Sequence, residues 1–421
     1  MKEIGLRSSV DARVRIPGSK SMTHRVLIAA ALAVGESRLE DALACGDTVV
    51  TQNGLSMLGV KITGEDNCFR VTGTGGAFPP ADGTGELDLG DSGTSYRLLL
   101  PVAAISRRQC LLTGSPRMQQ RPVGPLVQAL NELGGGALCM GKKGYPPVLV
   151  KGSGIAGGGV TIQGDTSSQF VSALLLCGPY ANKDVEIEVM GNLVSRPYVD
   201  VTTDVMDRFG VSVEREGYHR FKVRAGRPYQ ASRVPVEGDC SSASYFWAAA
   251  AVTGGRVVTE NIHPFSTRQG DLAFLQVMTA MGCRVAKGKA SVRVEGGRLR
   301  GIEVDMQDMP DMVPGLAAMA LFADGRTLIR NVAHLRHKES DRLRAVAQEF
   351  RKLGGAVEVL PDGLIIQGGR TLRGAVVDPH NDHRIAMSLA VVGLRVPGVR
   401  ILDEGCVEKS FPGFWDLWES L

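Results

Sequence analysis

Helices of small and apolar residues that open on a polar cluster recur along the chain, about every 72 residues. The openings begin at Ser21, Gly93, Ser167, Ser241, Asp311 and Asp382. After its polar start each helix is almost entirely apolar, which favours burial on every side rather than on one face. We therefore expect buried helices whose N-terminal ends point the same way, so that several helix dipoles converge on one surface.

A second helix in most repeats is marked by its end, where a large apolar residue precedes a glycine. These glycines are Gly59, Gly134, Gly210, Gly282 and Gly354. Glycine readily adopts the left-handed conformation that ends a helix, and strands with alternating apolar residues follow. The repeat is thus strand, helix, strand, helix, strand, which predicts a mixed α/β fold of layered sheets and helices.

The repeats also suggest how the chain divides. A chain of 421 residues that is 43% hydrophobic can form two domains or more. Three openings precede residue 237 and three follow it. We expect one lobe formed by residues 1–19 plus 238–421 and another formed by residues 20–237, with a hinge near residues 17–20 and 235–239.

Charge and hydropathy exclude several classes of protein. The net charge of +4, from 48 basic and 44 acidic residues, is too balanced for a nucleic-acid coat or a membrane-surface binder. The apolar runs fall short of the roughly 20 residues that span a bilayer. Because the N-terminus has no apolar signal core, we expect a cytoplasmic protein. Eight cysteines without a CxxC pair predict reduced thiols.

The first opening, PGSKSMTHR from Pro17, concentrates chemistry at a helix start. Ser19 or Ser21 can cap the helix, and Lys20 and Arg25 add positive charge there. Free backbone N–H groups and the helix dipole make such an end an anion site. The alternative is a solvated capping turn with incidental charge.

Other cations gather at segment ends rather than along exposed helix faces. They are Arg97, Arg121, Arg196, Lys338, Arg342, Arg384 and Lys409. Arg121 precedes Pro122, a favourable first helical residue, which predicts a second helix mouth. Lys338 and Arg342 are four residues apart and share a face if their segment is helical. A solvated ion-pair helix is the alternative there.

Familiar cofactor motifs fail on context. His380 and His383 are close in sequence, but no cysteine or carboxylate cluster completes a metal site, so we expect no metal and a hydrogen-bonding or anion-binding role for His383. The GSGIAG segment at Gly152 joins two strand-like runs and offers no helix for a dinucleotide. A site rich in Lys and Arg suits a multiply charged small phosphate or carboxylate.

Ten motifs in chain order resemble those of the 5-enolpyruvylshikimate 3-phosphate synthase (3-phosphoshikimate 1-carboxyvinyltransferase) family of enolpyruvyl transferases. They are PGSKSMTHR at Pro17, LGDSGTSYR at Leu89, RPVGPL at Arg121, SSQF at Ser167, LVSRPYVDVT at Leu193, VEGDCSSASYF at Val236, PDM at Pro310, KESDRL at Lys338, NDHR at Asn381 and EKSFPGF at Glu408. The resemblance covers nearly the whole chain. It implies a two-lobed fold with six inverse βαβαββ repeats, three in each lobe.

The resemblance also implies an activity. The enolpyruvyl group of phosphoenolpyruvate passes to the 5-hydroxyl of shikimate 3-phosphate by addition and elimination through a tetrahedral intermediate, with release of phosphate. The reaction belongs to the shikimate pathway, which leads to chorismate and the aromatic amino acids, and it uses no cofactor and no metal. We expect a monomer that binds neither nucleic acid nor membrane.

The family's pattern assigns roles to residues of this chain. Lys20, Asp311 and Glu339 would handle protons, Asp311 near the attacking hydroxyl and Glu339 near the methylene carbon. The residues around phosphoenolpyruvate would be Lys20, Gly93, Arg121, Gln169, Arg342, Arg384 and Lys409. Those around shikimate 3-phosphate would be Ser21, Arg25, Ser167, Ser168, Gln169, Ser195, Tyr198, Asp311, His334 and Lys338. The discontinuous lobe would serve phosphoenolpyruvate and carry the catalytic carboxylates, and the lobe of residues 20–237 would serve shikimate 3-phosphate.

Two residues depart from the family's pattern, since Asp91 and His334 stand where asparagine is usual. Asp91 adds negative charge near the phosphoenolpyruvate site or simply caps a helix, and His334 would add pH dependence. Gly93 is the expected residue type where glyphosate competes, so Gly93→Ala should crowd that inhibitor.

Two rival functions remain open. One is the sister enolpyruvyl transferase acting on UDP-N-acetylglucosamine, which uses a cysteine in one loop. In this chain the corresponding loop is Ser115 to Gln120, and it contains no cysteine. The other is a non-catalytic anion-binding or scaffolding protein of the same fold.

Overall fold

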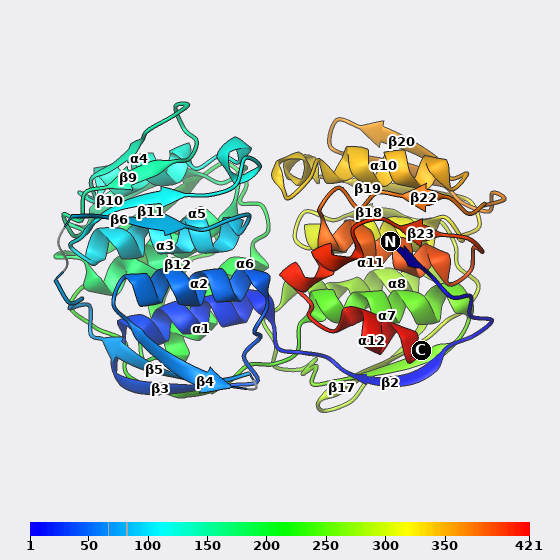
Figure 1. Cartoon of the computed structure of the whole chain (residues 1–421), viewed down its shortest axis with the longest axis horizontal. Helices are drawn as coiled ribbons and strands as arrows, with labels where there is room; N and C mark the ends of the chain where they lie inside the picture. Colours follow the sequence, from blue (N-terminus) through cyan, green and yellow to red (C-terminus); the bar gives the residue numbers. More distant parts are fainter. Residues whose placement is uncertain (66, 81–82) are drawn as a thin grey trace. The chain divides into compact units, whose positions relative to one another are not determined.

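The computed structural model describes residues 1–65, 67–80 and 83–421, and these form two compact units (Figure 1). We call Met1–Pro17 with Glu237–Leu421 the terminal unit, and Gly18–Val236 the inserted unit. The described part of the chain has no helix long and apolar enough to cross a membrane.

The inserted unit contains three four-stranded sheets, in the orders β14-β3-β5-β4, β6-β7-β9-β8 and β10-β11-β13-β12. In each sheet the first two strands named are parallel and the other pairs are antiparallel. The strands are β3 (Val34–Glu40), β4 (Lys61–Glu65), β5 (Cys68–Thr74), β6 (Thr84–Asp88), β7 (Gln109–Thr113), β8 (Ala137–Cys139), β9 (Val148–Val150), β10 (Gly158–Gln163), β11 (Val185–Met190), β12 (Val213–Glu216), β13 (Arg220–Val223) and β14 (Arg233–Pro235).

Two kinds of helix accompany these sheets. The apolar helices α1 (Lys20–Leu32), α3 (Gly93–Ile105) and α5 (Ser168–Cys177) are almost wholly buried. Their partners α2 (Gly46–Met57), α4 (Gly124–Glu132) and α6 (Pro197–Arg208) bury one side and expose the other. Two short 3-10 helices, η1 (Met118–Gln120) and η2 (Gly178–Tyr180), also lie in this unit.

The terminal unit repeats this plan. Two four-stranded sheets have the orders β16-β17-β15-β2 and β18-β19-β21-β20, and a third sheet has the order β1-β23-β22. The strands are β1 (Lys2–Glu3), β2 (Asp11–Arg15), β15 (Arg256–Glu260), β16 (Arg284–Lys287), β17 (Ser291–Glu295), β18 (Glu303–Asp305), β19 (Arg326–Arg330), β20 (Ala356–Leu360), β21 (Gly363–Gln367), β22 (Val376–Val377) and β23 (Arg400–Ile401).

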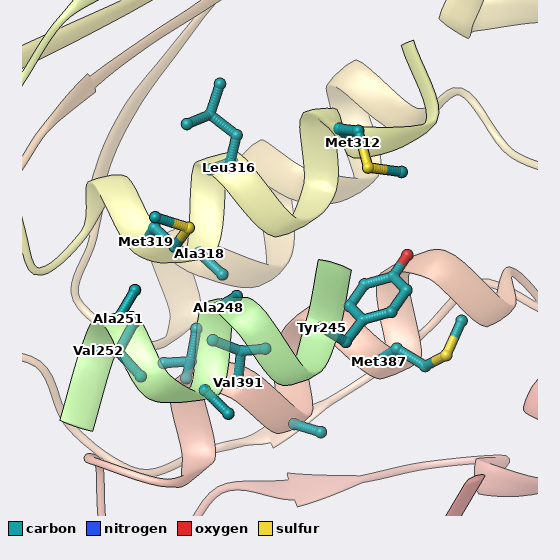
Figure 2. Packing of buried hydrophobic residues seen from close by; sticks show 14 of the residues in the cluster. Tyr245, Ala248, Ala251, Val252, Met312, Leu316, Ala318, Met319, Met387 and Val391 are labelled. Atoms are coloured by element: carbon teal, nitrogen blue, oxygen red, sulfur yellow. The ribbon is translucent and has the colours of Figure 1, made fainter. Parts of the chain in front are cut away.

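Three buried helices form the core of the terminal unit: α7 (Cys240–Thr253), α9 (Val313–Ala320) and α11 (His383–Gly393). They contact one another, and the small side chains of Ala248 and Ala318 lie between α7 and α9 (Figure 2). Alanine at this contact lets the helix backbones approach closely. The remaining helices are α8 (Phe274–Met281), α10 (Arg342–Lys352), α12 (Phe414–Glu419) and the 3-10 segments η3 (Gly270–Ala273), η4 (Pro310–Met312), η5 (Ala333–His337) and η6 (Glu404–Lys409).

The structure confirms the repeat read from the apolar pattern. Every residue of α7 is buried, as the all-round apolar sequence predicted. The five glycines expected to end second helices all have positive φ, from 83° at Gly210 to 114° at Gly282. The mixed α/β class with six sheets is therefore confirmed.

Two local predictions are wrong. Pro122 does not begin a helix: Arg121 ends η1, and α4 begins later, at Gly124. Lys338 and Arg342 do not share a helical face, because Lys338 is extended after η5 and Asp341 caps a new helix that starts at Arg342. In both places a short 3-10 helix, η1 or η5, precedes the α-helix and is separated from it by non-helical residues.

Candidate active site

The start of α1 brings a capped helix and an ion pair together. Ser19 caps the helix by accepting a hydrogen bond from the backbone N–H of Met22 at 3.4 Å. Lys20 is the first helical residue, and its Nζ lies 2.8 Å from Oδ2 of Asp47. Asp47 belongs to the first turn of α2 and was missed in the sequence, where it looks like an ordinary helix-start acid.

Arg25 is turned into the inserted unit. Its guanidinium donates to Thr202 Oγ1 at 2.7 Å, to the backbone oxygen of Ser21 at 2.7 Å and to Ser172 Oγ at 3.4 Å. Burial lowers the pKa of Arg25 to about 10, so the side chain is still cationic at neutral pH. Arg25 therefore ties α1 to α5 and α6, and its role toward shikimate 3-phosphate stays a prediction.

At the start of α3, Gly93 lies against the guanidinium group of Arg121. A Cβ built on Gly93 would lie 2.5 Å from Cζ of Arg121, so the glycine leaves room for that guanidinium. Arg121 donates to the backbone oxygen of Asp91 at 3.3 Å. Asp91 does not cap α3, because Ser92 does; its carboxylate accepts a hydrogen bond from the Ser115 hydroxyl instead.

Gln169 links the starts of α3 and α5. Its amide nitrogen donates to Thr94 Oγ1 at 2.9 Å, and its Oε1 accepts from Arg97 at 2.7 Å. Arg97 also lies over the ring of Phe170, with Cζ 5.3 Å from the centroid. The structure thus brings Gln169 into contact with the mouth of α3, where Gly93 and Arg121 meet.

Three predicted hydroxyl groups lie at helix starts. Ser167 caps α5 by accepting from the N–H of Gln169 at 3.3 Å, and Ser168 is the buried first residue of that helix. Ser195 precedes α6 with a φ of 55°, and its backbone oxygen accepts from the N–H of Tyr198 at 3.2 Å. A positive φ outside glycine marks a backbone that surrounding contacts hold in place.

The charged cluster of the terminal unit is centred on Arg342. Its guanidinium contacts Asp311, Glu339 and Asp382, each at 2.8 Å, and its side chain is only 1% exposed. Burial alone would lower the pKa of Arg342, but Asp382, Glu339 and Asp311 outweigh it and raise that pKa above its ordinary value. Arg342 is consequently a permanent cation shared by three acids.

Asp311 has a second strong partner. Arg384 contacts its other oxygen at 2.8 Å, and Nζ of Lys338 lies 3.9 Å from the oxygen that Arg342 contacts. Burial tends to raise the pKa of Asp311, but Arg384, Lys338 and Arg342 together hold it well below its usual range. Asp311 is thus an ionised carboxylate among cations.

Two further acids lie in this cluster: Asp382, which the sequence marks only as a helix opening, and Asp271, which no motif singled out. Asp382 caps α11 through the N–H of Arg384 and accepts from Ser340 Oγ at 3.0 Å. Asp271, in η3, accepts a hydrogen bond from Ser241; burial, reinforced by nearby Asp311, raises its pKa to about 7. In the sequence, both acids resemble ordinary helix-start residues.

His334 is buried beside this cluster, at 9% exposure, and its Nε2 has no hydrogen-bond partner within the described structure. Burial, aided by the positive charge of Lys338, lowers its pKa to about 3. His334 is therefore neutral at physiological pH in this structure, and the pH dependence expected from it stays a prediction.

The last predicted residue, Lys409, ends η6, which contacts α11. Each cluster belongs to one unit: the inserted unit holds Lys20, Gly93, Arg121 and Gln169, and the terminal unit holds the acids and cations around Arg342. Among the residues that the structure describes, no group of three His, Cys, Asp or Glu side chains could hold a metal ion.

Comparison with known proteins decides the family. Residues 5–418 match the family model of EPSP synthase (3-phosphoshikimate 1-carboxyvinyltransferase). The chain belongs to this family. The 3-phosphoshikimate 1-carboxyvinyltransferase of Methanoculleus marisnigri is 50% identical over 408 residues, which cover 97% of this chain and 96% of that protein. The enzyme of the same name from Methanosphaerula palustris is 47% identical over 410 residues, 97% of this chain and 96% of that protein.

A solved structure agrees with the fold. EPSP synthase from Acinetobacter baumannii matches with a TM-score of 0.82 and 28% identity, covering 99% of this chain and 97% of that chain. The predictions of the family, of its fold and of 3-phosphoshikimate 1-carboxyvinyltransferase activity in the shikimate pathway are confirmed. The roles of individual residues stay predictions.

Proposed function

We propose that the described clusters carry out the transfer of the enolpyruvyl group from phosphoenolpyruvate to the 5-hydroxyl of shikimate 3-phosphate. The observation that carries this proposal is the cluster around Arg342, where three cations and several carboxylates meet in a largely buried setting. Preorganised charges in such a setting strongly stabilise the charge that develops in a transition state, because the charged groups need little reorganisation.

In the first step, the 5-hydroxyl oxygen bonds to C2 of phosphoenolpyruvate while the methylene carbon C3 gains a proton. Asp311 takes the hydroxyl proton, Glu339 supplies the proton to C3, and Lys20 assists the transfer. In the second step, the C2–O bond to phosphate breaks and C3 returns a proton to Glu339. The proton held by Asp311 leaves with inorganic phosphate, and the other product is the enol ether. Every atom is supplied by the two substrates and by these proton-transfer groups.

The contacts of Asp311 suggest how substrate binding prepares it as a base. Arg342 and Arg384, which now neutralise Asp311, are also the cations assigned to phosphoenolpyruvate. An incoming carboxylate or phosphate competes for the same guanidinium groups. Once their charge is shared with the substrate, Asp311 loses part of its stabilisation as an anion and becomes a stronger base.

Binding of shikimate 3-phosphate is assigned to hydroxyl and cationic groups. Ser21, Ser168, Ser195, Tyr198 and Lys338 supply donors suited to its phosphate, carboxylate and hydroxyl groups. The positive φ of Ser195 supports this assignment, because held backbone of this kind is common at binding sites.

Phosphate release tests the proposal. The purified chain is incubated with phosphoenolpyruvate and either shikimate 3-phosphate or UDP-N-acetylglucosamine. We expect release only with shikimate 3-phosphate, and a loss of at least about a hundredfold in Glu339→Gln, which cannot donate the proton. The matched control is Glu358→Gln, since Glu358 is an exposed acid on β20 of the same unit.

Release with the UDP-sugar instead would favour the sister transferase, and release with neither acceptor would favour a scaffolding protein. The monomeric state and the cytoplasmic location remain predictions, of which light scattering on the purified protein tests the first.

A further inference from the structure

Asp47 is a buried acid that no step of the proposed reaction uses. Its side chain is 6% exposed, and its Oδ2 lies 2.8 Å from Nζ of Lys20, whose side chain is 12% exposed. A carboxylate and an ammonium at this distance, largely removed from water, interact more strongly than a surface pair.

The main chain at Asp47 is held by a chain of buried hydrogen bonds. Ser95 Oγ on α3 donates to the backbone oxygen of Asp47 at 3.1 Å and lies 2.7 Å from Thr51 Oγ1 on α2. Thr51 Oγ1 in turn lies 2.7 Å from Nδ1 of His24 on α1. These contacts tie the first turn of α2 to the two helices whose starts carry Lys20 and Gly93.

The same turn is fixed from its other side. Thr48 Oγ1 accepts from the backbone N–H of Cys45 at 2.9 Å and donates to the backbone oxygen of Leu43 at 2.6 Å. Asp47 also lies at the N-terminal end of α2, where the helix dipole stabilises negative charge. The carboxylate therefore has a fixed position and a favourable setting for its charge.

We propose that Asp47 is a positioning residue that keeps Lys20 charged and directs its ammonium group at the mouth of α1. The ammonium group of lysine sits on a flexible four-carbon stem, so a fixed partner is needed to hold it in one place. The proposal rests on the proposed function, since it matters for turnover only if Lys20 assists the transfer.

The test compares three variants with the wild-type chain. Asp47→Asn keeps the shape and removes the charge, and Asp47→Glu keeps the charge on a longer arm. The matched control is Asp204→Asn, because Asp204 pairs with Arg208 at the same 2.8 Å in the same unit but is 27% exposed. The measurements are kcat and KM for phosphoenolpyruvate, the melting temperature, and the rate at which trace acetic anhydride acetylates Lys20, read by peptide mass spectrometry.

For Asp47→Asn we expect kcat/KM to fall about tenfold or more, mainly through kcat, with the melting temperature close to that of the wild type. Acetylation of Lys20 should become faster, because only the neutral amine reacts and the carboxylate no longer stabilises the ammonium form. Asp47→Glu should recover part of both effects, and Asp204→Asn should match the wild type.

The proposal is overturned if Asp47→Asn stays within about threefold of the wild-type kcat/KM, or if Lys20 is acetylated at an unchanged rate. If Asp47→Asn does not fold, Asp47→Glu carries the test, with wild-type turnover and acetylation as the refuting result. If the wild-type chain itself releases no phosphate, the proposed function fails, whereas the acetylation rates still decide whether Asp47 controls Lys20.

Discussion

Replacing His334 with asparagine should make the terminal unit less sensitive to acid. The structure lowers the pKa of His334 from 6.5 to about 3, through burial and the nearby charge of Lys338. Between these two pH values the unfolded chain binds a proton at this position and the folded chain does not. Stability is therefore unaffected above pH 6.5 and decreases as the pH falls toward 3.

The magnitude follows from the size of this window. Each pH unit below 6.5 lowers the free energy of unfolding by about 1.4 kcal/mol, until the histidine of the folded chain also protonates. At pH 5 the loss reaches about 2 kcal/mol. In His334→Asn this contribution is absent, so the variant should lose about 2 kcal/mol less than the wild type between pH 7.5 and pH 5.

Tryptophan fluorescence during urea unfolding measures this difference. The chain has three tryptophans, Trp247, Trp415 and Trp418, and all lie in the terminal unit with His334, so the signal reports that unit. The control is His337→Asn, three positions along the same segment, whose side chain is exposed. Its acid sensitivity should equal that of the wild type.

The pH dependence separates this effect from simple loss of packing. A smaller side chain at position 334 lowers stability equally at both pH values, whereas loss of the histidine changes the difference between them. Equal acid sensitivity in His334→Asn and wild type would refute the conclusion that burial keeps His334 neutral. It would mean that water or a movement of η5 lets the imidazole protonate in the folded state.

Three other predictions follow from the two clusters. Gly93→Ala should raise KM for phosphoenolpyruvate about fivefold or more and weaken inhibition by glyphosate, because the new Cβ displaces the guanidinium end of Arg121. The melting temperature should stay nearly unchanged, since only the end of that side chain moves. Unchanged KM and inhibition constants would contradict this prediction. Arg342→Ala should lower the free energy of unfolding, measured in urea, by about 3–5 kcal/mol, since three acids lose a buried partner. A decrease of less than about 1 kcal/mol would contradict the shared role of Arg342. Because neighbouring cations hold the pKa of Asp311 well below its usual range, its protonation should cause no fall in kcat/KM from pH 8 to pH 5. An acidic fall in that range that disappears in Asp311→Asn, measured on its residual activity, would assign the fall to Asp311.

The repeat could be predicted from the sequence because its signals are local. A polar cap, an apolar run and a terminal glycine each lie within a few residues. Gly254 ends α7 and Gly282 ends α8, both with a positive φ. The segment around Lys338 differs from its prediction, because its residue spacing fits one helix whereas a 3-10 turn and the Asp341 cap divide it.

The acids of the site could not be found in the same way. Asp47, Asp271 and Asp382 each stand at the start of a helical segment, where an acid is common for reasons of capping alone. What distinguishes them is the partner that the fold brings near from distant sequence: Lys20 for Asp47, and Arg342 for Asp382. Such pairs depend on how repeats pack, which no local pattern records.

The shared use of Arg342 also connects stability with binding. In the absence of substrate, Asp311, Glu339 and Asp382 occupy the donors of its guanidinium, so the buried charge is compensated and the unit is stable. Under the proposed mechanism, a substrate anion competes with these acids for Arg342, which reduces the apparent affinity of the substrate but releases Asp311 and Glu339 for proton transfer. Tight binding of phosphoenolpyruvate alone would leave less of this interaction energy for the transition state. If the proposed roles hold, the internal acids favour a cluster that is stable without substrate and reactive once substrate is bound.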